Sequence, residues 1–209
     1  MTDASPAVAP LQLPWQPCER CGGLGVEATP AGDTVVFACP KCAHEEQRRR
    51  LPFFSITGPS GSGKSTVVRR LWRLLPECVS FDGDVLWHEN FWKDTQAFYD
   101  RWLAVAGQAS QSGHPVVVCT AAMPEAWQSS FAVLVREVHV LALVCDEDEL
   151  LARLEARQRP RDEQAPADFL WHTCNFNRVL RERLEHVDTS RFDPDEVAAR
   201  VVDWIRVRL

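Results

Sequence analysis

Residues 53–66 read Phe-Phe-Ser-Ile-Thr-Gly-Pro-Ser-Gly-Ser-Gly-Lys-Ser-Thr. The first five residues form an apolar run that is typical of a buried strand. Residues 58–65 then match G-x-x-x-x-G-K-[ST], a turn whose backbone N–H groups point inward at phosphate oxygens. A helix predicted over residues 64–75 adds the positive end of its dipole, and Pro76 ends it. Strand, turn and helix in this order predict a site for the phosphates of a nucleotide.

Individual side chains of this turn have predicted roles. Lys64 is expected to bridge the β- and γ-phosphates, and the Ser65 hydroxyl to ligate Mg²⁺. The donor is ATP or GTP, and the sequence favours neither. The residues predicted to bind the nucleotide are Gly58, Ser60, Gly61, Ser62, Gly63, Lys64, Ser65 and Thr66.

Strand and helix patterns alternate from Pro52 to the end of the chain. Strands are predicted over residues 53–57, 79–81, 116–120, 138–145 and 187–189, and helices over 64–75, 94–111, 124–136, 148–159, about 167–185, and from 194 onward. The last helix has a clear start, with Asp193 as N-cap, Pro194 at the first helical position and Glu196 as the capping-box acid. Such alternation predicts an α/β, three-layer P-loop NTPase fold, in which helices flank a parallel sheet.

A pair of acids follows the second predicted strand, in the segment Phe81-Asp82-Gly83-Asp84. Ligands of doubly wound sheets bind beyond the carboxyl ends of the strands, so both carboxylates are expected opposite the phosphate turn. One of them is predicted to hold the Mg²⁺ shell while the other accepts a proton from an acceptor hydroxyl. The alternative is a plain Asp-Gly turn between strand and helix, because both residue types favour turns.

The combination of GPSGSGKST at residues 58–66 with FDGD at residues 81–84 resembles the P-loop kinases of small molecules and nucleotides. That group includes gluconate kinase, adenylylsulfate kinase and nucleoside monophosphate kinases. The resemblance covers roughly residues 52–205 in the order of elements, but it is close only at these two motifs. It implies a phosphotransferase in which Lys64, Asp82 and Asp84 are catalytic. Adenylylsulfate kinase and polynucleotide kinase have Arg three residues after the second acid, where this chain has Trp87, so neither of those activities is assumed.

A P-loop ATPase is the competing interpretation. Such an enzyme needs an apolar strand that ends in Asp, often Asp-Glu, and residues 141–147 fit that pattern. Acids at positions 146–149 are equally typical of the first turn of a helix. The third predicted strand, which ends at Thr120, carries no acid. Since the resembled kinases use the acid after the second strand, the kinase is favoured.

An arginine-rich lid is predicted over residues 153–167. Its arginines are Arg153, Arg157, Arg159 and Arg161. In the resembled kinases, a mobile lid here neutralises the transferring phosphoryl group with bidentate Arg contacts and excludes water. Arg157 and Arg161 are the preferred catalytic residues, and Arg153 is ranked lower because it lies deep in the predicted helix. The alternative is a solvated helix face that pairs with Glu155 and Asp162.

Several residues are weaker candidates for the acceptor. The aromatic residues Trp87, Phe91, Phe98 and Trp102 recur at helical spacing and are expected to be buried. Trp87 or Trp92 is nevertheless a candidate to stack on a planar acceptor such as a nucleobase. The polar candidates are Arg101, Arg136, Asn175, Asn177 and Arg178.

Two cysteine pairs precede this domain. Cys18-x₂-Cys21 and Cys39-x₂-Cys42 are separated by seventeen residues, a spacing typical of a tetrahedral Cys₄ zinc site. Residues 18–46 are therefore predicted to form a zinc ribbon, with a β-ribbon that includes residues 34–38. Two disulfides or a redox pair are the less favoured alternatives. Residues 1–17 are predicted as a disordered or extended lead, residues 47–50 as a basic joint, and residues 51–209 as the kinase domain.

Composition limits the partners of the chain. A net charge of −6 gives no global attraction to nucleic acid or to an anionic membrane. The residues from Cys18 to Arg50 hold five basic and five acidic side chains, so nucleic acid is not favoured as a partner of the ribbon either. The longest apolar runs are strand-sized and no secretory pattern begins the chain, so a cytoplasmic protein without membrane contact is expected.

These patterns predict a phosphotransferase that moves the γ-phosphate of ATP or GTP to a small acceptor, with a nucleoside or nucleotide favoured. The alternatives are a kinase of polynucleotide 5′ ends and a P-loop NTPase or regulatory nucleotide-binding module without an acceptor. The predicted cofactors are Mg²⁺ and Zn²⁺. The sequence gives no prediction of oligomeric state.

Overall fold

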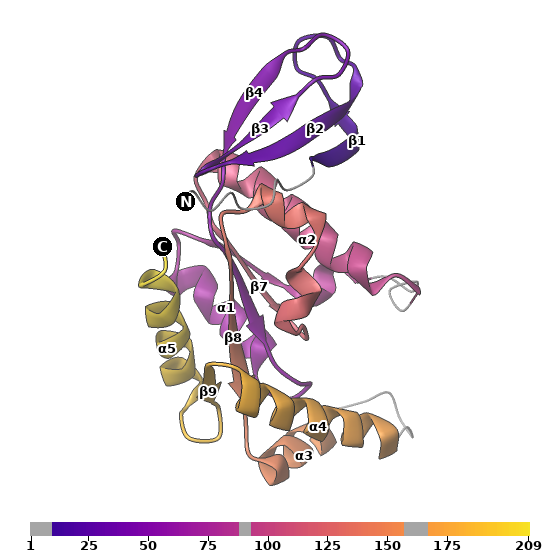
Figure 1. The fold of residues 1–209 in the computed structure, drawn as a ribbon. Coiled ribbons are helices and arrows are strands. Elements are labelled where there is room, and N and C mark those ends of the chain that lie inside the picture. Colours follow the sequence, from indigo (N-terminus) through magenta and orange to yellow (C-terminus); the bar gives the residue numbers. More distant parts are fainter. Residues whose placement is uncertain (1–9, 88–92, 157–166) are drawn as a thin grey trace, which may run out of the picture.

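The computed structural model describes residues 10–87, 93–156 and 167–209. Within these ranges the chain forms a four-stranded sheet followed by a five-stranded sheet. Figure 1 shows the first sheet standing at one end of the second, whose faces are covered by helices. No helix of the described residues is long and apolar enough to cross a membrane.

The five-stranded sheet is entirely parallel, with the strand order β6-β7-β5-β8-β9. Its strands are β5 (Phe53–Thr57), β6 (Val79–Asp82), β7 (Val116–Thr120), β8 (Val138–Val144) and β9 (His186–Asp188). Every residue of β5 and β7 is buried, because helices cover both faces of the sheet at its centre. This arrangement confirms the predicted α/β fold.

The helices lie on the two faces and at the carboxyl end of the sheet (Figure 1). They are α1 (Lys64–Leu74), α2 (Thr95–Ala109), α3 (Glu147–Glu155), α4 (Ala167–Arg183) and α5 (Pro194–Arg206), with short 3₁₀ turns η1 (Gly83–Leu86) and η3 (Ser110–Ser112). Helices α1 and α5 pack together over one face, and α2 covers the other. The predicted start of α5 is confirmed, because the Asp193 carboxylate accepts the N–H groups of Asp195 and Glu196.

The helix predicted over residues 124–136 is wrong. Two 3₁₀ turns replace it, η4 (Pro124–Trp127) and η5 (Ser130–Leu134). The Ser129 side chain accepts the N–H of Phe131 and so starts a second turn before the first can continue. Burial of Trp127 against Phe53 fixes the first turn on the sheet.

The N-terminal sheet is antiparallel in the order β1-β2-β3-β4, and we call it the ribbon. Its strands are β1 (Leu11–Pro17), β2 (Leu24–Ala31), β3 (Thr34–Ala38) and β4 (Glu45–Arg49). The lead before Cys18 was predicted to be disordered or extended. Residues 11–17 are extended and pair with β2 as a strand, while residues 1–9 lie outside the described ranges. An edge strand tolerates proline, and the alternation of buried Leu11 and Leu13 was too short to be recognised.

The predicted basic joint is also a paired strand. Residues 45–49 pair with β3 along its whole length. Arg48 donates to Glu46 at 2.7 Å, and its guanidinium lies 4.6 Å from the centre of the Phe37 ring. The Arg48 charge is therefore used inside the ribbon rather than left for a phosphate.

The ribbon is firmly attached to the kinase-like domain. Arg50 donates to the carbonyl of Gly32 in the ribbon and to that of Val135 after η5. Apolar residues of the ribbon share a core with Val133 and Leu134 of η5. This contact joins the two sheets through η5.

Candidate active site

The phosphate turn is shaped by its glycines. Gly61 and Gly63 have φ of +89° and +94°, a region that other residues rarely adopt. At Gly58, an added Cβ would lie 2.6 Å from the Leu143 carbonyl oxygen. Lys64 Nζ donates to the carbonyl oxygens of Gly58 at 2.6 Å and Pro59 at 2.9 Å, which holds the ammonium group against the turn.

A cleft of about 340 Å³ opens beside this turn. Its lining residues include Gly61, Gly63, Lys64, Ser65, Thr66, Arg153, Thr189, Phe192 and Pro194. One wall is thus the phosphate turn with the N-terminus of α1, and the other is the connection between β9 and α5. The Arg200 guanidinium lies 3.7 Å from the centre of the Phe192 ring and supports this apolar wall. An anionic end and an apolar end in one cleft suit a nucleotide.

Arg153 lies on this cleft, although its depth in the predicted helix ranked it below the other arginines. It donates to Thr189 Oγ1 at 2.9 Å and to the Thr189 carbonyl at 3.0 Å. It also reaches the Gly61 carbonyl at 3.5 Å and Glu149 at 2.9 Å. Arg153 therefore ties α3 to the phosphate turn and to the end of β9. Arg157, Arg159 and Arg161 lie outside the described residues.

Sequence reasoning did not identify Thr189 and Phe192 as part of this site. They are far from the phosphate turn in the sequence. The nearest feature that the sequence predicted was the helix N-cap Asp193. Strand β9 pairs with β8 on the side away from β5, and the residues that follow β9 then line the cleft beside the phosphate turn.

The acid pair lies at the carboxyl end of β6. The Asp82 carboxylate accepts the N–H of Asp84 at 3.3 Å and begins η1, so it also makes the local turn considered above. Gly83 is required here, because an added Cβ would lie 2.6 Å from the Thr120 side chain. Asp84 is exposed and Asp82 is half-buried.

Cys119 lies on β7, between the strand that precedes the acid pair and the strand that precedes the phosphate turn. Burial raises the pKa of its thiol to about 12, while the charge of Lys64 lowers the pKa and that of Asp82 raises it. Both charges therefore act on one thiol at the end of β7, the strand between β5 and β6. Asp82 pairs with Cys119 on one side of β7, and β5, whose carboxyl end leads to Lys64, pairs with the other side.

The alternative acid at the end of β8 is engaged elsewhere. Asp146 precedes α3 as its N-cap residue, and its carboxylate lies 3.6 Å from Arg181. Its N–H donates to Ser190. These contacts favour the helix-start interpretation over the ATPase one.

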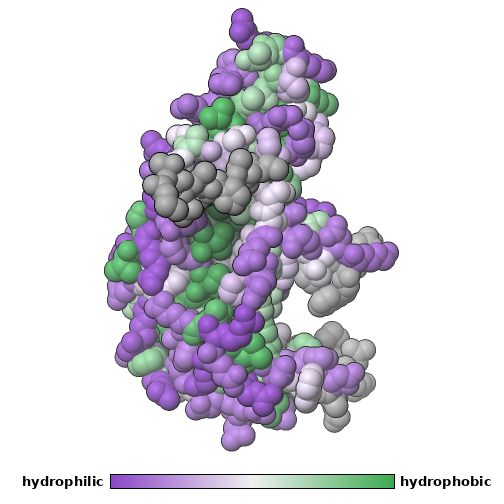
Figure 2. Space-filling view, in the orientation of Figure 1, coloured by the Kyte–Doolittle hydropathy of each residue, from purple (hydrophilic) through white to green (hydrophobic). Residues whose placement is uncertain are grey.

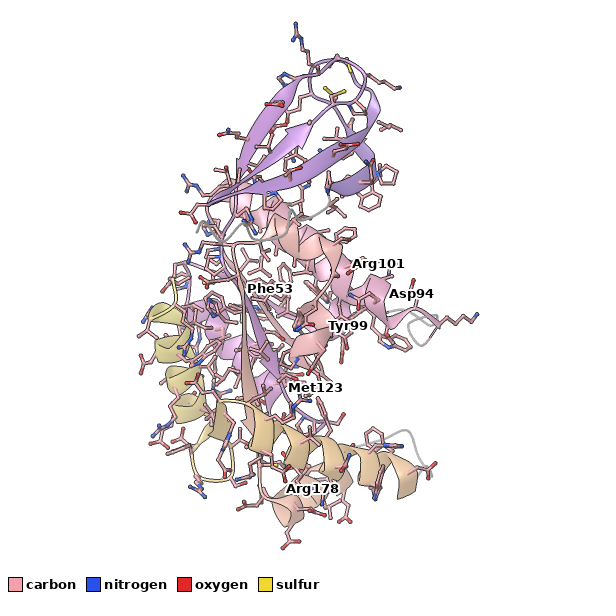
Figure 3. All side chains as sticks on the ribbon, in the orientation of Figure 1. Phe53, Asp94, Tyr99, Arg101, Met123 and Arg178 are labelled. Carbon is pink, nitrogen blue, oxygen red and sulfur yellow. The ribbon has the colours of Figure 1, made fainter. Side chains whose placement is uncertain are left out.

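The weaker candidates are placed as follows. Phe98 and Trp102 are buried as predicted. Burial was also predicted for Trp87, but it is 51% exposed, because it follows η1 in extended backbone and not in a helix. Phe91 and Trp92 lie outside the described residues. Asn177 is buried and bonds the backbone of Cys145, a structural role. Arg101 of α2 and Arg178 of α4, both labelled in Figure 3, are exposed.

Four thiols gather at the tip of the ribbon. The Sγ atoms of Cys18, Cys21, Cys39 and Cys42 all lie within 4.8 Å of one another. Two of the pairs, Cys18 with Cys42 and Cys21 with Cys39, are 3.7 Å apart. A tetrahedral zinc site with Zn–S of about 2.3 Å has edges of roughly 3.8 Å, so the thiols fit such an ion.

The two cysteine turns have the same backbone design. The N–H of Gly22 donates to the Cys18 carbonyl at 2.8 Å, and that of Ala43 donates to the Cys39 carbonyl at 3.0 Å. Gly22 and Ala43 both have positive φ, of 66° and 53°. Burial raises the pKa of the Cys39 thiol, but N–H groups of Cys42 and Lys41 outweigh it and bring the pKa to about 6.

A phosphate-binding turn between a central parallel strand and a helix, with carboxylates one strand away, defines a P-loop α/β nucleotide-binding protein. The AAA domain family matches residues 54–173, and the chain belongs to this family. No curated protein matches the sequence significantly.

Solved structures share the fold. A sugar kinase from Janibacter sp. HTCC2649 is 15% identical with a TM-score of 0.55, over 75% of this chain and 95% of that one. A gluconokinase from Sinorhizobium meliloti 1021 is 21% identical with a TM-score of 0.51, over 76% and 98%. The tunicamycin resistance protein of Deinococcus radiodurans is 16% identical with a TM-score of 0.55, over 75% and 96%. The chain therefore has the fold of P-loop kinases.

Proposed function

We propose that the protein is a phosphotransferase that moves the γ-phosphate of ATP or GTP to a hydroxyl group of a small acceptor. A nucleoside or nucleotide is the favoured class of acceptor. The observation that supports the proposal is the strand order, in which Asp82 at the end of β6 pairs with Cys119 of β7, and β5, which leads into the phosphate turn and Lys64, pairs with the other side of β7. Donor and acceptor can then meet at the carboxyl end of the sheet.

The donor is bound by the phosphate turn and the cleft beside it. Backbone N–H groups of residues 58–65 and the α1 N-terminus attract the phosphates. Lys64 leaves the carbonyls of Gly58 and Pro59 for the β- and γ-phosphates, and Phe192 offers an apolar wall to the base. Ser65 and Asp82 would hold a Mg²⁺ ion, which would neutralise charge at the phosphates.

The acid pair serves the acceptor. In the proposed step, the acceptor oxygen bonds to the γ-phosphorus while the bond from that phosphorus to the β–γ bridging oxygen breaks. Asp84 takes the hydroxyl proton, and the electron pair of the broken bond stays on the nucleoside diphosphate. The exposure of Asp84 lets an acceptor reach it. Arg157 and Arg161 remain the arginines proposed to neutralise the transferred group.

Incubation with γ-labelled ATP or GTP and a panel of metabolites tests the proposal. We expect label on a small hydroxyl compound. Label that appears only as free phosphate, with no acceptor stimulating turnover, would show an NTPase or regulatory module instead. Label on oligonucleotide ends would show a polynucleotide kinase.

Two variants test the roles of the residues. Lys64→Ala should lower kcat by at least about 100-fold without loss of fold, and Asp84→Asn by about 100- to 10,000-fold without loss of nucleotide affinity. Arg73→Ala and Asp203→Asn change exposed charges on α1 and α5 and are the matched controls. Unchanged transfer by the Asp84 variant would remove it as the base.

For the ribbon we propose a structural zinc ion held by Cys18, Cys21, Cys39 and Cys42. The edge lengths of the thiol cluster and the two matching turns support this assignment. We also propose a cytoplasmic location, where the reducing environment would keep these thiols available to the ion.

A further inference from the structure

Helix α2 begins far from the ribbon and ends beside it. Figure 1 shows its carboxyl end at the base of the ribbon, and Figure 2 shows its amino end projecting from the body of the molecule. Its 15 residues rise by about 22 Å, at 1.5 Å for each residue. A single helix therefore runs from the ribbon along the face of the parallel sheet.

The carboxyl half of α2 is packed on the ribbon and hydrogen-bonded to it. Ala104 lies against the apolar core that the ribbon shares with η5. An added Cβ on Gly107 would lie 2.9 Å from the Leu134 Cβ, so α2 and η5 are already in close contact there. Just past the helix, the Gln111 side chain donates to the Arg49 carbonyl at the end of β4 at 3.0 Å. These contacts fix this half of α2 to the ribbon.

The middle of α2 packs on the segment that carries the acid pair. The ring centres of Trp102 and Phe81 lie 5.2 Å apart, and Phe81 directly precedes Asp82. Leu86, two residues after Asp84, packs on the same apolar cluster as Trp102. The two carboxylates are therefore bracketed by side chains that pack against α2 and its cluster.

The donor cleft is built from other elements. Its lining residues belong to the phosphate turn, α1, α3, α5 and the connection between β9 and α5. Helices α1 and α5 cover one face of the sheet, and α2 covers the other. A displacement of α2 should therefore move the carboxylates while it leaves nucleotide binding intact.

Resting on the proposed function, we propose that the ribbon positions the acid pair by holding α2 in place. Trp102 is the positioning residue, because its ring contacts the strand that ends in Asp82. A displacement of reacting groups by about 1 Å lowers a rate by about 100-fold. The ribbon thus controls the proposed phosphoryl transfer through packing, without contact with either substrate.

Unfolding of the ribbon tests the inference. In Cys39→Ser we expect kcat for phosphoryl transfer to fall by about 10- to 100-fold, while the Kd of a fluorescent ATP or GTP analogue changes by less than about 2-fold. Cys174→Ser lies outside the thiol cluster and should keep both values. Unchanged kcat, or an equal loss of nucleotide affinity, would overturn the inference.

A matched pair of tryptophan variants separates positioning from packing. Trp102 and Trp127 are 1% and 2% exposed in the same apolar cluster. The ring of Trp127 packs on Phe53 and Tyr99, whereas that of Trp102 packs beside the acid pair. Trp102→Leu and Trp127→Leu should lose similar stability, but kcat should fall at least about 10-fold further in Trp102→Leu. Equal losses of kcat would show an effect of packing alone and would contradict the inference.

Hydrogen exchange gives a readout that needs no acceptor. The Trp87 N–H donates to the Asp84 carbonyl at 2.9 Å, so this amide reports on the turn that carries the acid pair. Its exchange should be at least about 10-fold faster in Cys39→Ser and Trp102→Leu, but not in the two control variants. Unchanged exchange would overturn the inference alone. Faster exchange in a protein that transfers phosphate to no acceptor would refute the proposed function and still support the link through α2.

Discussion

The ribbon and the parallel sheet are both β-structures, but different forces stabilise them. Strands β5 and β7 are buried at every position, and the sheet has helices on both faces. In the ribbon, β3 alternates buried with half-buried residues, and no residue of β4 is fully buried. A segment of about forty residues with one buried face cannot supply enough apolar burial to fold by itself. We infer that the ribbon depends on its thiol cluster and on its contact with the parallel domain. The parallel sheet is stabilised by its own helices and needs neither the thiol cluster nor the ribbon.

Loss of one thiol of the cluster should have the largest effect on the stability of the ribbon relative to that of the parallel sheet. Cys39→Ser should abolish zinc binding and unfold the ribbon, because structural zinc contributes about 10–16 kcal/mol of apparent binding free energy. Zinc content and hydrogen exchange of the two sheets measure the effect, and amides of β5 and β7 should keep their protection. Cys174→Ser, outside the cluster, is the control and should retain one zinc ion. Full zinc content in the Cys39 variant would refute the assignment.

The second-largest effect is expected from weakening the contact between the ribbon and the parallel domain. Leu134 is 5% exposed and belongs to the core shared by the ribbon and η5. Leu134→Ala should lower the free energy of unfolding by about 2–5 kcal/mol and deprotect the amides of β1 and β2 first. Leu180→Ala removes a fully buried leucine side chain from the parallel domain, and should not affect the ribbon selectively. Identical exchange patterns in both variants would mean that the ribbon does not depend on this contact.

Within the parallel domain, a buried charge gives a smaller effect with a pH signature. Burial raises the pKa of Asp188, but the Ser190 N–H and Arg181 outweigh it, so the pKa lies below the ordinary value. The stabilisation is therefore present above the ordinary Asp value of about 3.9 and is lost as pH falls towards the lower folded pKa. Asp188→Asn should cost about 1–3 kcal/mol at neutral pH. Urea denaturation should show less acid sensitivity in this variant than in Asp203→Asn.

The smallest expected effect stabilises the ribbon. Ala43 has φ of 53°, which costs an L-residue free energy that glycine does not incur. Ala43→Gly should therefore raise ribbon stability by up to about 1 kcal/mol, as measured by resistance to a zinc chelator. Ala31→Gly, in the extended backbone of β2, should do the opposite. Destabilisation by both changes would show that the Ala43 backbone is not strained.

The same contrast explains which parts were predictable. The phosphate turn, the parallel strands and the Asp193 cap depend on residues close together in the sequence, and they were predicted correctly. Strand β1 was missed because its proline content hides two buried leucines, and η4 and η5 were taken for a helix because Ser129 interrupts the pattern. The sequence did not indicate that Arg153 lines the cleft, since depth in a helix does not show which face meets a cleft. Its rank relative to Arg157 and Arg161 stays a prediction.

By itself, the sequence determined the phosphate turn, the parallel fold and the paired cysteines. Each is encoded by short-range backbone requirements, such as glycine at positive φ or fixed ligand spacing. Only the tertiary structure decided that Arg153, Thr189 and Phe192 share the cleft and that the ribbon is anchored on η5. Those facts depend on which strands become neighbours and how each helix is rotated about its axis, and long-range packing sets both.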